Sequence, residues 1–293
     1  MLVLQLKALG DVSRMRLLAL CRLGECSVTE LTRITGQSQP RVSQQLKQLC
    51  EAGFLERFRD GRRVYYRVPM RGTGGELRCR LLDLIPAEDD LFRRDADRLL
   101  RHRGDRVADR RAEEVDDAAD RAIHKAFVEL TVTAPIGALL DIGCGRATLL
   151  KLLASRAQRA VGVDIDAGAR QLARAELMLA GVPNCSLRKG DMYQLPFADG
   201  EFNTIIMDDV LGGAREPVRA LAEAKRLLRP GGRIFVLLSA DGDAAGLLQR
   251  SLAEWSTGAG LRLAPGRLVP SDDPKWLLAV ATLLETTITT AAA

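Results

Sequence analysis

Apolar residues recur at the period of an α-helix near the beginning of the chain. Residues 15–21 carry such a stripe, and Ser13 just before it can cap the helix. Residues 27–30 read Ser-Val-Thr-Glu, which is the order of a capping box. A short second helix is therefore expected to begin there and to end at Gly36.

The third expected helix has one apolar face and one polar face. Ser38 precedes it as a cap, and Pro40 fits its first turn, where no amide donor is needed. Val42, Leu46 and Leu49 recur on one side at helical spacing. The opposite side projects polar side chains, namely Arg41, Gln44, Lys47 and Gln48.

A basic hairpin is predicted after the third helix. Two runs, FLERFR and RRVYYRV, flank Asp60-Gly61, and an Asp-Gly pair in this setting is a strong signal for a two-residue turn. Two helices, a polar-faced helix and a basic hairpin follow one another as in a winged helix-turn-helix. We therefore expect residues 1–70 to form an α+β domain of this kind.

Residues 71–130 are expected to be helical and strongly charged. The run ELRCRLLDLI places leucines on one side and stops at Pro86. A second amphipathic pattern extends from Val115 to Leu130. Between them the run LFRRDADRLLRHRGDRVADRR interleaves Arg and Asp, which favours salt-bridged helices that face solvent. We interpret the region as a dimerisation region and linker.

From Gly137 onward, short apolar runs alternate with helical stretches, a pattern typical of a parallel sheet. The runs are ALLDI, RAVGVDI, CSLRKG, FNTIIMD and GRIFVLL, followed by two further candidates, LRLAPGRLV and KWLLAVATL. Seven strands with helices between them predict a Rossmann-like α/β domain over residues 131–293. A length of 293 residues suits more than one domain.

The net charge of +5 is unevenly distributed along the chain. Through Met70, twelve Lys and Arg stand against six Asp and Glu, a balance of +6, so the remaining residues sum to −1. A basic N-terminal domain is expected where a protein meets phosphates, although a solvated basic surface would have the same composition.

Composition favours a cytoplasmic protein without a membrane partner. No run approaches the roughly 18 apolar residues of a membrane span. The N-terminus lacks the basic region and cleavage site of a signal peptide. Six scattered cysteines without a CxxC pair are typical of reduced, packed thiols.

Glycines and acidic residues stand where four of the expected strands end. Gly143 and Gly145 follow the first strand and let the backbone approach a ligand closely. Asp164 lies about 20 residues further on, where a carboxylate accepts hydrogen bonds from ribose hydroxyls. Asp191 and Asp208 follow the third and fourth strands. Such ends meet at one edge of a parallel sheet and predict a ligand site, although any single acid could instead cap a helix.

The N-terminal residues resemble the ArsR family of bacterial regulators over about residues 3–68. SQPRVSQQLKQLCEAGFLERFRDGRRVYY matches the typical reading helix and wing of that family. The resemblance implies a homodimer that binds double-stranded promoter DNA at an inverted repeat about one helical turn apart. It assigns Gln39, Arg41, Ser43 and Gln44 to base edges, and Lys47, Arg59, Arg62 and Arg63 to phosphates.

Four later blocks resemble the class I S-adenosylmethionine-dependent methyltransferases over about residues 137–283: LLDIGCGRATLL, AVGVDID, RKGDMYQLPFADGEFNTIIM and AKRLLRPGGRIFVLL. NAD is the competing cofactor, but Thr148 stands where its third turn glycine would be. The resemblance implies S-adenosylmethionine or S-adenosylhomocysteine as the ligand. It places Asp141, Gly143 and Gly145 at the amino-acid end, Asp164 at the ribose and Asp191 with Met192 at the adenine, with Cys144, Ile165 and Asp208 as further residues of the site.

The combination resembles the S-adenosylhomocysteine-responsive regulators of the methionine cycle, which implies that the methyltransferase fold acts as a ligand sensor. We therefore expect a dimeric ArsR-like transcriptional regulator that senses S-adenosylmethionine or S-adenosylhomocysteine. Movement of helices 76–130 is the expected link between ligand and DNA.

The alternative is an active methyltransferase of a small-molecule acceptor that also regulates its own gene. Residues after the fourth strand, DDVLGGAREP, would then line the acceptor side, with Asp208 or Asp209 as candidate general base and the catalytic residues otherwise unknown. A metal-responsive repressor is disfavoured, because Ser27 and Thr29 stand where the ArsR metal site has cysteines.

Overall fold

The computed structural model describes residues 2–69, 75–86, 88–108, 117–132, 134–240, 244–271 and 274–284. The chain divides into two compact units. The first comprises Met1–Glu114, Gly145–Ala147 and Asp166–Lys189, and the second comprises Val115–Cys144, Thr148–Ile165 and Gly190–Ala293. Part of the expected linker, Val115 included, lies outside the described residues.

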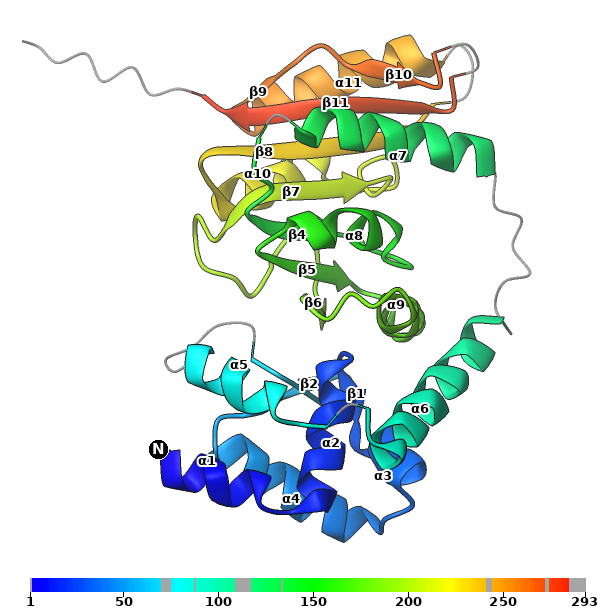
Figure 1. The fold of residues 1–293 in the computed structure, drawn as a ribbon. Helices are drawn as coiled ribbons and strands as arrows, with labels where there is room; N and C mark the ends of the chain where they lie inside the picture. The colour runs from blue at the N-terminus through cyan, green and yellow to red at the C-terminus, as the bar shows by residue number, and fades with distance from the viewer. Residues whose placement is uncertain are drawn as a thin grey trace, which may run out of the picture. The chain divides into compact units, whose positions relative to one another are not determined.

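The beginning of the first unit has the expected winged helix-turn-helix fold (Figure 1). Its strands pair antiparallel in the order β1-β3-β2, with Phe58 opposite Tyr65 in the hairpin. Leu17, Leu31 and Leu46, one from each of three helices, are fully buried and form its core. The elements are α1 (Leu2–Leu9), α2 (Val12–Arg22), β1 (Cys26–Ser27), α3 (Val28–Thr35), α4 (Gln39–Glu51), β2 (Glu56–Asp60) and β3 (Arg63–Arg67).

Capping residues mark the beginnings of α2 and α3 and the end of α3. Ser27 and Glu30 form the expected capping box, and Gly36 ends α3 with a left-handed φ of 70°. The cap of α2 is Asp11, whose Oδ1 accepts from Arg14 N at 2.9 Å. The prediction that Ser13 caps this helix is wrong. Ser13 lies inside α2, because the Asp11 carboxylate two residues earlier accepts from the free amide of Arg14.

Four further elements complete the first unit: α5 (Gly75–Asp83), α6 (Asp90–Ala108), α9 (Ala167–Leu179) and β6 (Cys185–Lys189). Helix α6 packs against α2, α3 and α9. Phe92 and Leu99 of α6 and Met178 of α9 belong to the same buried cluster as the helix-turn-helix core. The segment α9–β6 is therefore part of one hydrophobic core with the winged helix.

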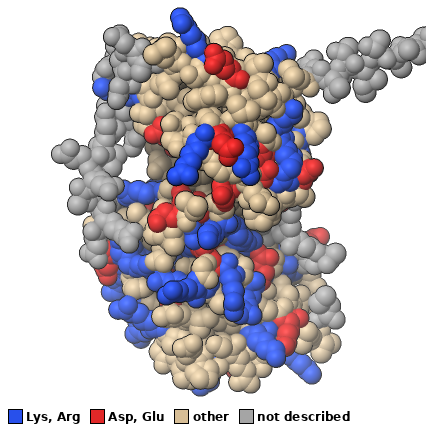
Figure 2. Space-filling view, turned by 180° about the vertical axis from the view of Figure 1, so that it is seen from behind, with Lys and Arg blue, Asp and Glu red and all other residues tan. Residues whose placement is uncertain are grey.

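Charged side chains of both signs are interspersed on the face of the molecule in Figure 2. The interleaved charges of α6 were expected to face solvent in the same way. Two of them do not, because Asp95 and Arg103 are each only 2% exposed. Asp95 receives hydrogen bonds from Arg16 Nε at 2.6 Å and Nη2 at 2.9 Å, so the carboxylate is buried together with a partner of opposite charge.

The second unit contains the mixed sheet of a Rossmann-like fold (Figure 1). Within this unit the strand order is β10-β11-β8-β7-β4-β5, with β9 also paired to β11. Strands β5, β4, β7 and β8 are parallel, whereas β11 runs antiparallel to β8. The elements are α7 (Asp117–Val132), β4 (Ala138–Ile142), α8 (Thr148–Leu153), a 3-10 turn (Ala154–Arg156), β5 (Arg159–Asp164), β7 (Phe202–Asp208), α10 (Pro217–Leu227), β8 (Leu228–Ser239), α11 (Ala244–Gly258), β9 (Leu261–Leu263), β10 (Arg267–Val269) and β11 (Trp276–Leu283).

The run LRLAPGRLV, expected as one strand, forms the two short strands β9 and β10. Both pair antiparallel with β11. Pro265 between them has no amide hydrogen to donate, which interrupts the ladder. A Cβ on Gly266 would lie 2.7 Å from Leu277 Cδ1, so the backbone crosses close to β11 at this point. The described chain therefore has eight strands after residue 137, where seven were expected.

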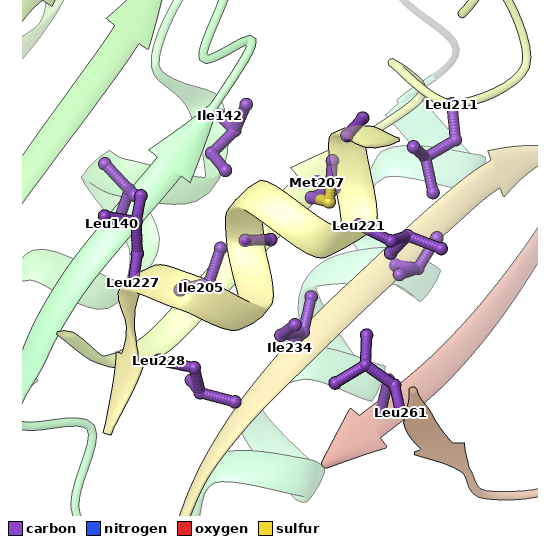
Figure 3. Packing of buried hydrophobic residues seen from close by; sticks show 14 of the residues in the cluster. Leu140, Ile142, Ile205, Met207, Leu211, Leu221, Leu227, Leu228, Ile234 and Leu261 are labelled. Atoms are coloured by element: carbon purple, nitrogen blue, oxygen red, sulfur yellow. The ribbon is translucent and has the colours of Figure 1, made fainter. Parts of the chain in front are cut away.

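The core of the second unit lies between its parallel strands and α10 (Figure 3). Leu140, Ile205 and Ile234 come from three neighbouring strands, and Leu221 and Leu227 come from the helix. All five are fully buried. This packing holds the strands in place, and with them the loops at their carboxyl ends.

Candidate functional site

A cavity of about 520 Å³ opens at the carboxyl ends of β4, β5 and β7 in the second unit. This volume lies within the usual range for small-molecule sites. The cavity is lined by apolar side chains together with two carboxylates and one guanidinium: Ile142, Gly143, Val163, Asp164, Ile165, Gly190, Asp191, Met192, Tyr193, Val210, Gly213 and Arg215.

Gly143 forms the tight turn after β4. Its φ is 77°, and its amide donates to Val163 O at 2.8 Å, while Cys144 N donates to the same oxygen at 3.0 Å. A Cβ at this position would lie 2.1 Å from Val210 Cγ1. Only glycine therefore satisfies both the left-handed backbone and the close approach of the loop that follows β7.

The end of β5 presents a polar residue and then an apolar one to the cavity. Asp164 is half-buried, whereas the next side chain, Ile165, is 68% exposed. Opposite them, Gly190 N donates to Asp164 O at 3.3 Å, and Asp191 Oδ1 accepts from Tyr193 N at 3.1 Å. The loops after β5 and β6 thus place one carboxylate each at the cavity wall.

Asp141 on β4 is a buried acid without a cationic partner among the described residues. It is 2% exposed, and its Oδ1 accepts no hydrogen bond. Burial raises the pKa of its carboxyl group well above the usual value, and the negative charges of Asp208 and Asp164 raise it further. A positively charged group bound nearby would relieve this repulsion and supply the missing donor.

Asp209 serves the backbone instead of the cavity. Its φ is 51°, its amide donates to Leu237 O at 2.9 Å, and its Oδ1 accepts from Ser239 N at 2.9 Å. The side chain thereby joins the end of β7 to the end of β8. A carboxylate engaged in this way is a poor candidate for the general base that the sequence suggested.

The cavity brings together five of the nine residues expected at the cofactor: Gly143, Asp164, Ile165, Asp191 and Met192. The other four, Asp141, Cys144, Gly145 and Asp208, do not line it. Sequence reasoning did not single out Tyr193, Val210, Gly213 and Arg215. The last three belong to the DDVLGGAREP segment, whose place after a strand end was the available signal.

The winged helix presents the residues that were expected to meet DNA. Helix α4 buries its apolar face and exposes Gln39, Arg41, Gln44 and Lys47, with Ser43 half-buried. The exposed wing positions are Arg59, Arg62 and Arg63. These side chains lie on α4 and on the β2–β3 hairpin, and the cationic ones among them are accessible to a ligand of negative charge.

The stretch where the ArsR metal site would lie is engaged in protein contacts. Ser27 caps α3, and the buried Cys26 thiol lies 3.6 Å from two carbonyl oxygens, those of Leu20 and Gly24. Within the described ranges, no group of three or more His, Cys, Asp or Glu side chains is placed to hold a metal ion.

Each helix that the structure describes falls short of a membrane span in length or in apolar character. None of the helices that the structure describes is both long enough and apolar enough to cross a bilayer.

The fold is an α/β domain of the Rossmann-like class, with a cavity at its strand ends, combined with a winged helix-turn-helix. Residues 140–236 match a family model described as a methyltransferase domain, and residues 11–57 match that of the bacterial regulatory protein arsR family. The chain therefore combines an ArsR-family helix-turn-helix with a methyltransferase domain, as both resemblances implied.

Curated relatives match part of the chain. An uncharacterized 37.1 kDa protein in transposon TN4556 of Streptomyces fradiae is 33% identical over 52% of this chain and 47% of its own length. Demethylmenaquinone methyltransferase of Symbiobacterium thermophilum is 31% identical over 39% of this chain and 47% of its own length. Ubiquinone/menaquinone biosynthesis C-methyltransferase UbiE of Burkholderia mallei is 32% identical over 42% of this chain and 53% of its own length. The chain thus spans about half the length of these relatives.

Solved structures share the fold of the methyltransferase domain. The [4+2]-cyclase SpnF has a TM-score of 0.50 at 20% identity, covering 59% of this chain and 83% of its own. The glycopeptide N-methyltransferase MtfA, complexed with sinefungin, also has a TM-score of 0.50, at 14% identity, covering 59% and 90%. At these identities the likeness concerns the fold alone.

Proposed function

We propose that the protein is a transcriptional regulator of promoter DNA that senses S-adenosylmethionine or S-adenosylhomocysteine. The observation that carries this proposal is the presence, in one chain, of an exposed polar reading helix and a ligand cavity at the strand ends of a methyltransferase domain. Residues 1–70 would bind DNA, residues 131–293 would bind the ligand, and residues 71–130 would contribute to dimerisation and join them in the cytoplasm.

The chemistry of the cavity supports the proposed ligand. Asp141 lies directly before the lining residue Ile142, and the amino group at the amino-acid end of either ligand would offset its buried negative charge from the cavity side. Asp164 is placed to accept hydrogen bonds from a ribose. The exposed Ile165 and the half-buried Met192 offer apolar surface for an adenine ring. Cys144, Gly145 and Asp208 would support these contacts from the surrounding loops.

The DNA-binding half of the proposal rests on the exposed polar side chains of α4 and the wing. Gln39, Arg41, Ser43 and Gln44 would face base edges, since Gln suits adenine and Arg suits guanine. Cationic side chains set further along would hold phosphates and fix the register without reading sequence; these are Lys47, Arg59, Arg62 and Arg63.

A homodimer is supported by apolar side chains that the single chain leaves uncovered. Leu2, Val3, Leu4 and Leu6 on α1 are 47–65% exposed, and Leu84, just after α5, is 71% exposed. Helices with such faces pair readily, because association removes the apolar surface from water. Two copies would then present two reading helices to an inverted repeat about one helical turn apart.

The second candidate is an active methyltransferase of a small-molecule acceptor with an autoregulatory DNA-binding domain. It is favoured by the similarity of the chain to curated relatives that are methyltransferases. The fold alone does not decide for turnover, since one of the solved structures that share it is a [4+2]-cyclase. The catalytic residues of this second candidate stay unassigned among the described side chains of the cavity.

Fluorescence anisotropy tests the proposal directly. DNA from upstream of the protein's own gene is titrated with the full chain, alone and with saturating S-adenosylmethionine or S-adenosylhomocysteine. We expect one of the two ligands to change the Kd for DNA by about 5–150-fold. DNA binding that is indifferent to both ligands, together with turnover of a small nucleophile, would favour the methyltransferase.

A further inference from the structure

The segment α9–β6 connects two loops of the ligand cavity while packing on the winged helix. In the sequence it lies between Asp164-Ile165 on one side and Gly190-Asp191 on the other, and both pairs line the cavity. By its own contacts the segment belongs to the first unit. A ligand that holds the two loops therefore acts on both ends of α9–β6 through the chain itself.

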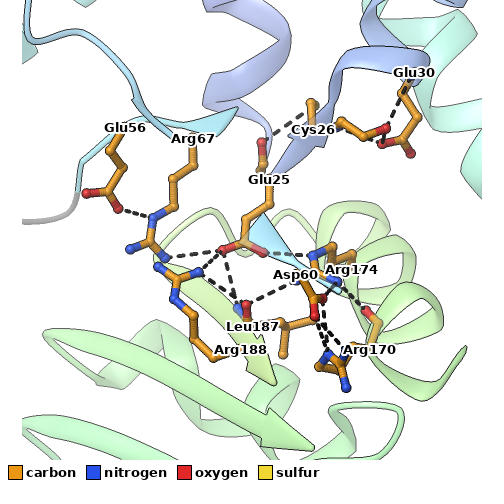
Figure 4. Close-up of polar contacts among 12 residues, drawn as sticks. Glu25, Cys26, Glu30, Glu56, Asp60, Arg67, Arg170, Arg174, Leu187 and Arg188 are labelled. Carbon is orange, nitrogen blue, oxygen red and sulfur yellow. Dashed lines mark hydrogen bonds and ion pairs between the residues drawn. The ribbon is translucent and has the colours of Figure 1, made fainter. Parts of the chain in front are cut away.

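Asp60 at the hairpin turn is held by two arginines of α9 (Figure 4). Its Oδ1 accepts from Arg170 Nη2 at 2.6 Å, and Arg170 Nε lies 3.0 Å from each carboxylate oxygen. Arg174 Nη1 lies 2.8 Å from Oδ2. The three side chains are 4%, 1% and 3% exposed, respectively. We call Asp60, Arg170 and Arg174 the wing clamp.

Glu25 adds a second anchor beside the wing clamp (Figure 4). Its Oε2 accepts from Arg174 Nε at 2.8 Å, and its Oε1 accepts from Leu187 N and from Arg188 Nη1, both at 3.3 Å. Because Glu25 directly precedes β1, it ties the base of the winged helix to α9 and β6. The winged helix is therefore attached to this segment at two points.

The wing clamp is charged and stiff. Burial by itself raises the pKa of Asp60, but the Arg170 and Arg174 guanidinium groups outweigh it and hold that pKa below its usual value. Separating the buried charges would leave them uncompensated, and the forked contact fixes orientation as well as distance. A movement of α9 is therefore expected to move the hairpin with it.

The clamp residue Asp60 lies among the exposed arginines of the wing. Arg59 precedes it, and Arg62 and Arg63 follow within the same hairpin. Since a hairpin of this length is a single small element, the orientation of Asp60 sets the direction in which these arginines point.

We propose that α9 transmits the effect of ligand binding to the wing that contacts DNA phosphates, and that the wing clamp connects the two. The inference rests on the proposed function and names the regulation of that site. A ligand that holds Asp164 acts two residues before Asp166, whose Oδ1 accepts from Ala169 N at 2.5 Å and caps α9. Arg170 follows just over one helical turn later, so a tilt of α9 re-aims the hairpin.

The experiment compares the wild type with the double variant Asp60→Asn/Arg170→Gln and the control Asp199→Asn. The double variant removes both charges of the forked contact, so neither remains buried and unpaired, and Arg174 keeps Glu25 as its partner. Asp199 also pairs with an arginine, Arg226 at 2.6 Å, but its side chain is 81% exposed.

The readout is the ratio of the Kd for DNA with and without S-adenosylmethionine and, separately, S-adenosylhomocysteine, measured on the full chain. We expect the ratio to fall from about 5–150 in the wild type to below about 2 in the double variant, with the control unchanged. Calorimetry should give the double variant a Kd for the ligand within about threefold of the wild type, because the clamp lines no part of the cavity.

Hydrogen exchange on the wild type provides a test that does not depend on folding of the variant. Ligand binding should change amide protection in residues 56–67 and in 166–179. A double variant that responds like the wild type, or protection changes confined to helices 76–108, would overturn the inference and leave the proposed function standing. If neither ligand changed the DNA affinity of the wild type, both the inference and the proposed function would be overturned.

Discussion

Arg103 and Glu30 form a buried ion pair at the beginning of α3, with Arg103 Nη2 3.2 Å from Glu30 Oε1. The same guanidinium donates to Glu25 O at 2.6 Å and to Arg174 O at 2.8 Å. One side chain of α6 therefore stabilises the capping box of the helix-turn-helix and the base of the wing at once.

Replacing Arg103 with Met should destabilise the protein by about 3–5 kcal/mol at neutral pH, because it removes the nearer cation from the buried Glu30 and leaves only Arg106, 3.9 Å away. Urea unfolding measures the loss. Arg101→Met is the matched control, since Arg101 lies exposed on the same helix.

The loss from Arg103→Met should depend on pH. Burial by itself raises the pKa of Glu30, but Arg103 and the Ser27 hydrogen bonds outweigh it and lower that pKa. A lowered pKa contributes stability above the unfolded value, about 4.3, that disappears as pH falls through the folded value. The difference between variant and wild type should therefore shrink below about pH 4. An equal loss of stability at neutral pH and below about pH 4 would contradict the ion-pair explanation.

Asp141→Asn should stabilise the ligand-free protein at neutral pH while weakening ligand binding. The folded pKa of Asp141 is raised, so stability decreases as pH rises from the unfolded value, about 3.9, toward the folded one. Asparagine removes that decrease, and it also removes the charge that would attract an amino group. We expect a higher melting temperature and at least about tenfold weaker binding, or 1.4 kcal/mol, by calorimetry. A lower melting temperature at pH 7 would refute the account of Asp141.

Arg62→Ala should weaken DNA binding to a similar degree on every sequence tested. An exposed wing arginine that meets a phosphate contributes charge without reading bases, so its loss should lower the slope of log Kd against log salt by about 1. Anisotropy over a range of salt concentrations measures the slope. A changed base preference would show that Arg62 reads sequence.

Arg41→Ala should relax preference at one base pair of the operator. An arginine on the reading helix discriminates guanine by about 1–3 kcal/mol, and that discrimination should disappear at one position only. Competition among single-substituted operators identifies the position. If binding to all of these operators were weakened equally, Arg41 would contact a phosphate and not a base.

Local signals in the sequence predicted much of the fold. The capping box of Ser27 and Glu30, the end of α3 at Gly36 and the turn at Gly143 each depend on residues that are close in the chain, so short patterns suffice. The cavity followed from the rule that parallel strands end at one edge, which explains why Asp164 and Asp191 were found.

Long-range charge pairing could not be predicted in the same way. Arg170 and Asp60 are 110 residues apart, and Arg174 and Glu25 are 149 apart. A sequence shows each as an ordinary charged residue, and the interleaved charges of α6 similarly concealed the burial of Arg103. Whether a charge is solvated or buried depends on a partner that only the tertiary fold supplies.

The interruption at Pro265 also affects how this protein behaves in a crowded solution. A long, flat edge strand offers a row of unpaired amides and carbonyls to which another chain can add. Here the outer partners of β11 are the three-residue strands β9 and β10, and of the three residues between them Pro265 has no amide hydrogen to donate. This described edge is therefore too short and too broken to template strand addition, which protects this side of the sheet from aggregation.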